Sequence, residues 1–235
     1  MLIPVILFVI YLLLMVLKNM DEELLKFSLP LFALALFIFA IYWILKISKE
    51  NKQAREKANH YFTALKRSLG APYPTFHLRE EDRQYLIDND FTGEAIYYHL
   101  VVPFMTHLNA PFTMFNINVT DGKNSNIAGA YSTLKNIPTI DILIKPEYNI
   151  EQIIATGCHE CMHHYLRIKK IRGRTVEANE KLTDYACIYT GFEDLLYRGY
   201  TVVETNNGLM DTWTKVGYLT KKEVNVAIKC LKNFK

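Results

Sequence analysis

The sequence predicts an α+β domain that follows a pair of membrane-spanning helices. Three observations support this class: two long apolar runs near the start of the chain, β-branched and aromatic runs in its middle, and helix-period patterns on both sides of that middle region. Hydrophobic residues make up 50% of the 235 residues, which excludes a disordered chain, and four cysteines are too few for a disulfide framework. With a net charge of +3 and no nucleic-acid-binding motif, we expect no nucleic acid as a partner.

Two apolar runs near the start of the chain resemble membrane-spanning helices. Leu2–Leu17 contains no charged residue, and Phe27–Leu45 is interrupted only by Ser28 and Pro30 near its start. The linker between the runs is short and charged. The sequence therefore predicts a transmembrane helical hairpin over residues 1–48, in contact with the lipid bilayer, with both chain ends on one side.

The orientation of this hairpin follows from the basic residues near its ends. A cleaved signal peptide fits the first run poorly, because no basic residue precedes Leu2 and no small-residue cleavage site follows Leu17. Basic residues are frequent just after the second run, from Lys46 to Lys57, and only two stand in the linker. We therefore expect a cell-membrane protein whose N-terminus and residues 49–235 are cytoplasmic, with a membrane protein as a possible partner.

The first half of residues 49–235 changes from helical to strand periodicity. Helix-period patterns precede the change in three segments: Lys49–Leu69, Glu80–Asp88 and Thr92–Leu108. Pro103 is expected to kink the third of these helices. β-branched and aromatic runs then predict three strands of a small sheet: Phe112–Val119, Ile127–Leu134 and Thr139–Ile144.

The second half is again mainly helical. Asn149 followed by Gln152 forms a capping-box pattern, which predicts a helix that runs to about Arg167. A second helix is expected over Val176–Thr190, ended by Gly191. Turn and capping patterns then predict a hairpin and a final helix: strands at Tyr200–Glu204 and Leu209–Lys215, and a helix from Thr220, whose capping-box partner is Glu223, to about Leu231.

The capped helix after the sheet contains an HExxH motif. His159 and His163 are four residues apart, so on a helix both imidazoles face one point, as two ligands of a zinc ion do. Glu160 lies on the same side, where it can accept a proton from a metal-bound water without being a ligand. The spacing therefore predicts a Zn²⁺ site with an adjacent general base.

The next helix offers a third ligand at a suitable distance. Glu180 follows His163 by 17 residues and can complete a His₂Glu set that leaves a position open for water. Asp184, one turn later, can accept the remaining N–H of a ligand imidazole and fix its tautomer. The predicted metal ligands are thus His159, His163 and Glu180.

The HExxH motif followed by NExxxD resembles the gluzincin metallopeptidases, the thermolysin-like branch of the zincins. The resemblance covers about residues 125–190 and implies a zincin-like domain, with a small antiparallel or mixed sheet plus active-site helices, over residues 49–235. It implies zinc ligation by the three predicted ligands, Glu160 as the general base, and Asp184 and Asn179 as residues that support the ligands. It also implies that Gly129–Tyr131 and Thr139–Ile144 border the substrate groove.

The chain departs from the thermolysin pattern at the residue that stabilises the oxyanion. No histidine follows His164, so the downstream histidine of that pattern has no counterpart. A tyrosine replaces it in other gluzincins, and three residues are candidates here: Tyr185, Tyr189 and Tyr218.

Two other features have alternative interpretations. Cys158 and Cys161 form a CxxC pattern that could make a structural zinc site with Cys187 and a histidine, although buried cysteine more often acts as a small hydrophobic residue. The basic loop Arg167–Arg174 is either a solvated connection or a contact for anionic lipid or an acidic substrate.

The complete set of ligands and base predicts a membrane-anchored zinc metallopeptidase that hydrolyses peptide bonds of a peptide or protein substrate. In this hypothesis a zinc-activated water attacks the peptide carbonyl and Glu160 is the general base. The alternative is a non-hydrolytic zinc-binding membrane module that is a structural or regulatory subunit of a larger complex. The absent oxyanion histidine motivates this alternative.

Overall fold

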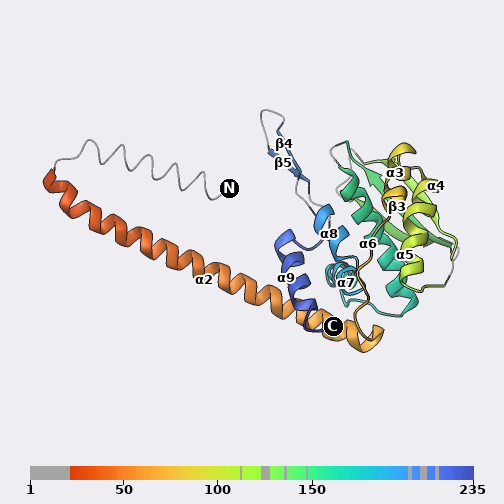
Figure 1. The fold of residues 1–235 in the computed structure, drawn as a ribbon, viewed down its shortest axis with the longest axis horizontal. Coiled ribbons are helices and arrows are strands. Elements are labelled where there is room, and N and C mark those ends of the chain that lie inside the picture. The colour runs from red at the N-terminus through yellow and green to blue at the C-terminus, as the bar shows by residue number, and fades with distance from the viewer. Residues whose placement is uncertain are drawn as a thin grey trace. The chain divides into compact units, whose positions relative to one another are not determined.

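The computed structural model describes residues 22–111, 113–122, 128–134, 137–146, 148–200, 203–206, 211–214 and 217–235. The chain divides into two compact units, Met1–Lys52 and Gln53–Lys235. The first predicted membrane span, Leu2–Leu17, lies outside the described residues. The second lies within helix α2, Glu22–Leu69, which ends at Gly70 in a left-handed conformation (φ +84°) (Figure 1).

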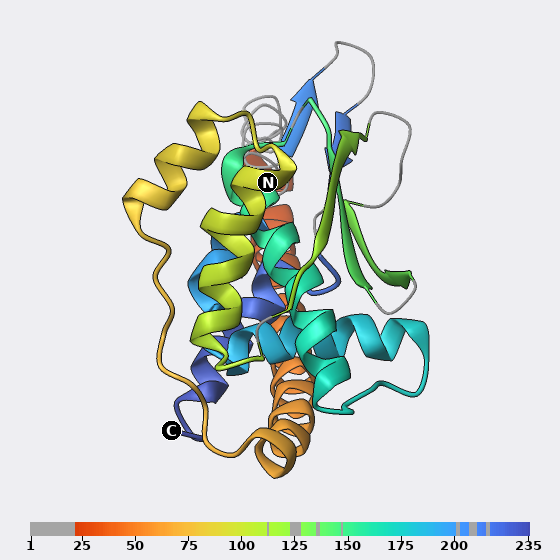
Figure 2. The ribbon, with the colours of Figure 1, turned by 90° about the vertical axis from the view of Figure 1, so that its right-hand side faces the viewer.

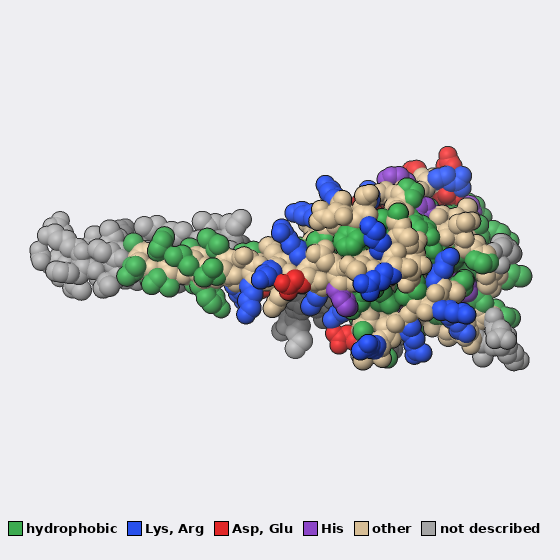
Figure 3. Space-filling model, turned by 90° about the horizontal axis from the view of Figure 1, so that it is seen from below, with side chains coloured by type: hydrophobic (Ala, Val, Ile, Leu, Met, Phe, Trp, Pro, Cys, Tyr) green, Lys and Arg blue, Asp and Glu red, His purple; other side chains and the backbone are tan. Residues whose placement is uncertain are grey.

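The prediction of a transmembrane hairpin is wrong. Among the residues that the structure describes, no helix combines the length and the apolarity that a membrane crossing requires. The apolar stretch of α2 is exposed at residues such as Phe37, Ile44 and Leu45. Figure 3 shows hydrophobic side chains, in green, along this part of the helix. From Lys46 onward the same helix becomes rich in charged residues. This finding also overturns the predicted localisation as a two-span protein of the cell membrane.

The predicted α+β, zincin-like fold class also needs correction. The described residues are mostly helical, with one small three-stranded sheet and a separate two-stranded one. The three predicted strands are present with shifted bounds: β1 Asn116–Asp121, β2 Gly129–Leu134 and β3 Ile137–Ile144. The sheet is therefore a minor part of a helical unit.

The three-stranded sheet has the order β1-β3-β2. β1 pairs with β3 in parallel, and β2 pairs with β3 antiparallel, with Gly129 opposite Ile142 and Tyr131 opposite Ile140. Ile140 and Ile142 on the central strand are buried. Because β2 pairs on one side only within the described sheet, its other edge is left for the site described below.

A π-helical turn stands where a proline kink was expected. The segment comprises α4 Gly93–Ile96, the π-helix η1 Tyr97–Val101 and α5 Val102–His107, and Pro103 lies in the first turn of α5. Proline has no N–H to donate, so the α-helical hydrogen-bond pattern is interrupted around it. Ahead of this segment, the predicted helix α3 Glu80–Asp88 is confirmed.

Helix α6, Ile150–Ile168, is the centre of the second unit. Its N-terminus is capped as predicted, since Asn149 accepts from the Gln152 N–H and the Gln152 side chain accepts from the Asn149 N–H. Figure 2 shows the sheet on one side of α6 and α5 on the other, and most α6 side chains are buried. The helix is thereby held by hydrophobic contacts over most of its surface.

The remaining elements are α7 Val176–Tyr189, α8 Glu193–Gly199, the antiparallel strands β4 Val203–Asn206 and β5 Asp211–Thr214, and α9 Lys221–Leu231. Of these, α7 and α8 pack against α6, α9 packs against α7 and α8, and the last two strands pair with each other. The capping box of Thr220 and Glu223 at the start of α9 is confirmed, and so is the predicted strand pair. Helix α8 was not predicted. The second unit thus places α6 and α7 side by side, with their polar faces toward β2.

Candidate metal centre

Helices α6 and α7 bring three ligand atoms together. Nε2 of His159 and Nε2 of His163 are 3.1 Å apart, and Oε2 of Glu180 lies 3.0 Å from each of them. The two histidines come from successive turns of α6, and the glutamate comes from the first half of α7. These three residues are the one group of histidine, cysteine and acidic side chains among the described residues that is placed to share a metal ion.

Asp184 fixes the tautomer of His159. The Nδ1–H of the imidazole donates to Oδ1 of Asp184 over 2.8 Å, and the carboxyl group is fully buried. Because an ionised carboxylate can only accept, the proton of the neutral ring lies on Nδ1 and the lone pair of Nε2 points at the shared position.

Thr183 fixes the tautomer of His163 in the same way. The Thr183 hydroxyl donates to the backbone carbonyl of Asn179 (2.9 Å), so its lone pairs are left to accept from Nδ1–H of His163, 3.2 Å away. The Nε2 atom of the neutral ring is again a bare acceptor. When both rings are neutral, two imidazole lone pairs and one carboxylate oxygen therefore converge with no donor among them.

Such a cluster of acceptors requires a cation. Four-coordinate zinc with ligands at about 2.0–2.1 Å separates them by about 3.3 Å, so the observed 3.0–3.1 Å triangle fits after a small expansion. Protons meet the same requirement in the absence of metal. Burial lowers the pKa of His159, but hydrogen bonds to Asp184 and Glu180 outweigh this effect and raise that pKa well above 6.5. The donor set could hold a metal ion and does not by itself select zinc.

The charge of Glu180 responds to the same neighbours. Burial would raise the pKa of this carboxyl, yet hydrogen bonds from His159 and His163 lower it to about 2. Glu180 is therefore ionised under all ordinary conditions, which is the state that a metal ligand needs.

The carboxyl group of Asp184 is itself held by the segment that follows β5. Its Oδ2 accepts from the backbone N–H groups of Tyr218 and Leu219, each over 2.8 Å, and the Tyr200 hydroxyl donates to Oδ1. Gly217 precedes this clamp with φ +84°, and a Cβ there would lie 2.0 Å from the Tyr200 ring. The segment can approach the ring because residue 217 has no side chain.

Glu160 lies beside the triangle and not in it. Its side chain is 5% exposed and faces edge strand β2, where a Cβ on Gly129 would come within 2.8 Å of Oε1. Burial raises the pKa of Glu160, and the nearby imidazoles of His159 and His163 oppose that shift. A carboxyl with a raised pKa next to a metal site is suited to exchange protons.

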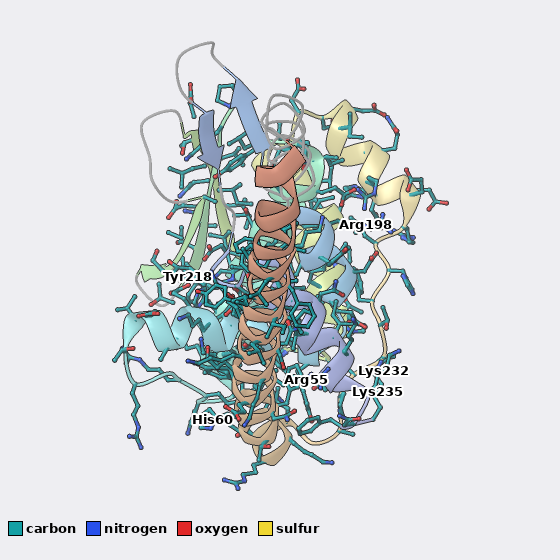
Figure 4. All side chains as sticks on the ribbon, turned by 90° about the vertical axis from the view of Figure 1, so that its left-hand side faces the viewer. Arg55, His60, Arg198, Tyr218, Lys232 and Lys235 are labelled. Atoms are coloured by element: carbon teal, nitrogen blue, oxygen red, sulfur yellow. The ribbon has the colours of Figure 1, made fainter. Side chains whose placement is uncertain are left out.

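The three ligands and Glu160 open into one cavity of about 840 Å³. Its walls come from β2, α6, the loop after α6, α7 and the segment around Tyr218. Tyr131 and Tyr218 flank the imidazoles, with the Tyr218 ring stacked on that of His159 at 6.0 Å and the Tyr131 ring stacked on that of His163 at 6.3 Å. In Figure 4, Tyr218 lies near the sheet and α7.

The other tyrosine candidates lie elsewhere. Tyr185 is buried against the Tyr61 ring at 4.6 Å, and the hydroxyl of Tyr189 donates to the carbonyl of Gly70. Of the three tyrosines considered for the oxyanion, only Tyr218 lines the cavity.

Asn179 lines the cavity, and in the described part of the chain its side chain makes no hydrogen bond to the three candidate ligands. Its Oδ1 accepts from the Gly173 N–H (3.1 Å) and so ties the loop after α6 to α7. The cysteines do not contribute: Sγ of Cys158 and Sγ of Cys187 are 3.9 Å apart in the hydrophobic core, with Cys161 buried as well.

Several residues of the site were not anticipated from the sequence. Thr183 stands three positions after Glu180, a helical spacing that could have pointed to it. Tyr200 reaches the site through a tertiary contact and carries no local signal in the sequence.

No protein-family model matches the chain, and the searches of curated proteins and of solved structures find no match either. A functional conclusion therefore depends on the residues of this cavity.

Proposed function

We propose that the chain is a zinc-dependent metallopeptidase that hydrolyses peptide bonds. The observation that supports this most is the common cavity of three convergent ligand atoms and one non-ligand carboxyl, Glu160. Membership of the gluzincin family is likewise a proposal, because a cluster of two histidines and a glutamate does not identify that family.

Zinc bound by His159, His163 and Glu180 would lower the pKa of a water and polarise a carbonyl oxygen. Glu160 would take the proton from that water and deliver it to the leaving amine. Burial raises the pKa of Glu160, and a carboxyl group with a raised pKa can both accept and release a proton more readily.

Strand β2 would hold the substrate backbone. Its residues Gly129, Ala130 and Tyr131 form one wall of the cavity, and the sheet leaves this edge unpaired among the described strands. An extended peptide can add to such an edge through main-chain hydrogen bonds. Glu160 lies against Gly129, so a peptide on this edge passes the proposed base.

Tyr218 is the residue that we propose for stabilising negative charge on the carbonyl oxygen. Burial, followed by the charges of Glu180, Glu160 and Asp184, raises the pKa of its phenol. The group is therefore neutral and retains its O–H for donation at neutral pH. This property is needed by a donor that faces a developing oxyanion.

The proposal is tested with purified protein and a casein or peptide-library digest. Glu160→Gln should lower kcat by roughly 100-fold or more, because it removes the proton acceptor. The same variant should bind as much zinc as the parent. Equal rates of cleavage in the variant and the parent would show that the mechanism is wrong, and Glu151→Gln, at the far end of α6, is the matched control.

A further inference from the structure

One end of the cavity is lined by three basic side chains: Arg167, Lys170 and Arg172. All three are exposed to solvent, and within the described part of the chain none forms an ion pair with a carboxylate. The acidic residues in the cavity wall are Glu160 and Glu180, which belong to the metal centre. The charged side chains of the cavity wall outside the metal centre are therefore all positive.

The basic end has a defined position along β2. Three contacts join α6 to this strand in the same order along both elements: Glu160 faces Gly129, His164 Nδ1 lies 3.0 Å from the Tyr131 hydroxyl, and Arg167 Nη1 donates to Thr133 Oγ1 over 2.5 Å. Helix and strand thus run in the same direction along the cavity. Arg167 follows His163 by one helical turn, so it lies toward the C-terminal end of β2.

The loop that carries the other two cations is fixed at both ends. After α6 the backbone turns through Lys170 (φ +57°), and the Ile171 N–H donates to the Leu166 carbonyl. Gly173 then donates to Asn179 on α7 and approaches that backbone so closely that a Cβ would lie 2.4 Å from the Asn179 nitrogen. Lys170 and Arg172 are therefore held at the cavity by a tethered loop.

We propose that this basic end recognises an acidic side chain of the substrate, on the N-terminal side of the bond that is cleaved. This inference rests on the proposed peptidase function. An antiparallel peptide is the more stable partner for a strand edge. A peptide antiparallel to β2 runs from Thr133 toward Gly129, so the residues that precede the cleaved bond lie nearest Arg167, Lys170 and Arg172.

An acidic peptide explains these features better than a nucleic acid. The cations line a cavity that also contains the metal-binding side chains, and a strand edge offers main-chain hydrogen bonds. Nucleic-acid binding requires an extended basic surface, and the whole chain has a net charge of only +3.

The test begins with a bond that the protein cleaves in casein. Peptides around that bond carry Glu, Gln or Lys at single positions on either side of it, and kcat/KM is measured for each. We expect Glu on the N-terminal side to exceed Gln by about fivefold, the upper range for a solvent-exposed ion pair. The preference should shrink as ionic strength rises from about 0.01 to about 1 M, because the Debye length falls from about 30 to about 3 Å.

Charge reversal at the basic end should invert the preference. The double variant Lys170→Glu, Arg172→Glu should favour Lys over Glu at the same position. Arg174→Glu is the matched control, because Arg174 is an exposed cation of the same loop that does not line the cavity. It should keep the parental preference.

The outcomes separate this inference from the proposed function. Hydrolysis that depends on Glu160 but shows no charge preference, or a preference only on the C-terminal side, overturns the acidic subsite and leaves the peptidase standing. Without hydrolysis, fluorescence anisotropy compares a labelled Glu peptide with its Gln counterpart. Equal binding of the two, binding unchanged by the double variant, or equally effective competition by a single-stranded oligonucleotide would each overturn the subsite.

Discussion

Asp184 holds one imidazole of the candidate metal centre although it is not among the three proposed ligands. Both of its oxygens are occupied, one by His159 and Tyr200 and the other by the backbone N–H groups of residues 218 and 219. The carboxylate accepts every one of these bonds and donates none. This makes its charge, as well as its shape, part of the site.

Replacement of Asp184 by asparagine should weaken metal binding by about 10- to 100-fold, a range typical of residues that orient a ligand. The amide keeps the shape of the side chain but places an NH₂ against either the Nδ1–H of His159 or the two backbone N–H groups. The zinc affinity of the variant is measured with a competing chelator. Asp194→Asn, on an exposed carboxylate paired with Arg198, is the matched control and should leave the affinity unchanged.

The convergence of His159, His163 and Glu180 could be predicted from their regular spacing, whereas the residues that hydrogen-bond to them could be predicted only in part. Two histidines four apart on a capped helix must share a face, and Glu180 and Asp184 share a face of the next helix. The contacts of Tyr200 and of the segment after Gly217 with Asp184 depend on the tertiary fold, which brings a later part of the chain back to α7. No local sequence pattern predicts these tertiary contacts.

At the scale of the element, the N-terminus of α6 is capped, and the middle of the helix carries the two histidines of the candidate metal centre. The reciprocal bonds of Asn149 and Gln152 satisfy N–H groups that the first turn leaves without partners. The start of α6 is thereby fixed more than two turns before His159.

Asn149→Ala should lower the free energy of unfolding by about 1 kcal/mol, because it removes the acceptor for the Gln152 N–H. Denaturant titration with matched m-values measures the change. Asn225→Ala, in the exposed middle of α9, is the control and should be neutral or slightly stabilising. A loss in the control as large as that at residue 149 would contradict the role of the cap.

Elements with explicit end signals were predicted well, and the others were not. The capping residues of α6 and α9 and Gly191 after α7 marked their helices correctly. Helix α8, by contrast, begins after Phe192 without a side-chain cap. The stretch Tyr97–Val101 follows helical periodicity, which does not distinguish a π-turn from an α-helix.

At the scale of the whole molecule, local patterns were a poor guide to class. The apolar runs near the start of the chain suggested a hairpin in the membrane. The hydropathy of a segment, however, does not show where the helix that contains it begins and ends. In α2 the apolar segment is continuous with a charged one, and no described helix can cross a membrane. The strand signals did predict the small three-stranded sheet, in which Ile140 and Ile142 are buried, but most of the described residues are helical.

The architecture of the second unit gathers the site from distant parts of the sequence. Gly129 on the sheet edge, the ligands on α6 and α7, and the clamp at residues 217–219 all meet at one cavity. If these residues bind a metal ion, replacing one of the three ligands should abolish metal binding. Replacing a neighbouring carboxylate that is not a ligand should leave metal binding unchanged.

Elemental analysis of zinc-loaded, dialysed protein tests this claim most directly. The parent should hold about one equivalent of zinc, as expected for a three-ligand site with one open position. Glu180→Ala should lose that equivalent, and Glu177→Ala, which removes an exposed carboxylate of the same helix paired with Lys181, should retain it. A parent that retains no metal, or a Glu180→Ala variant that retains the full equivalent, would contradict the account.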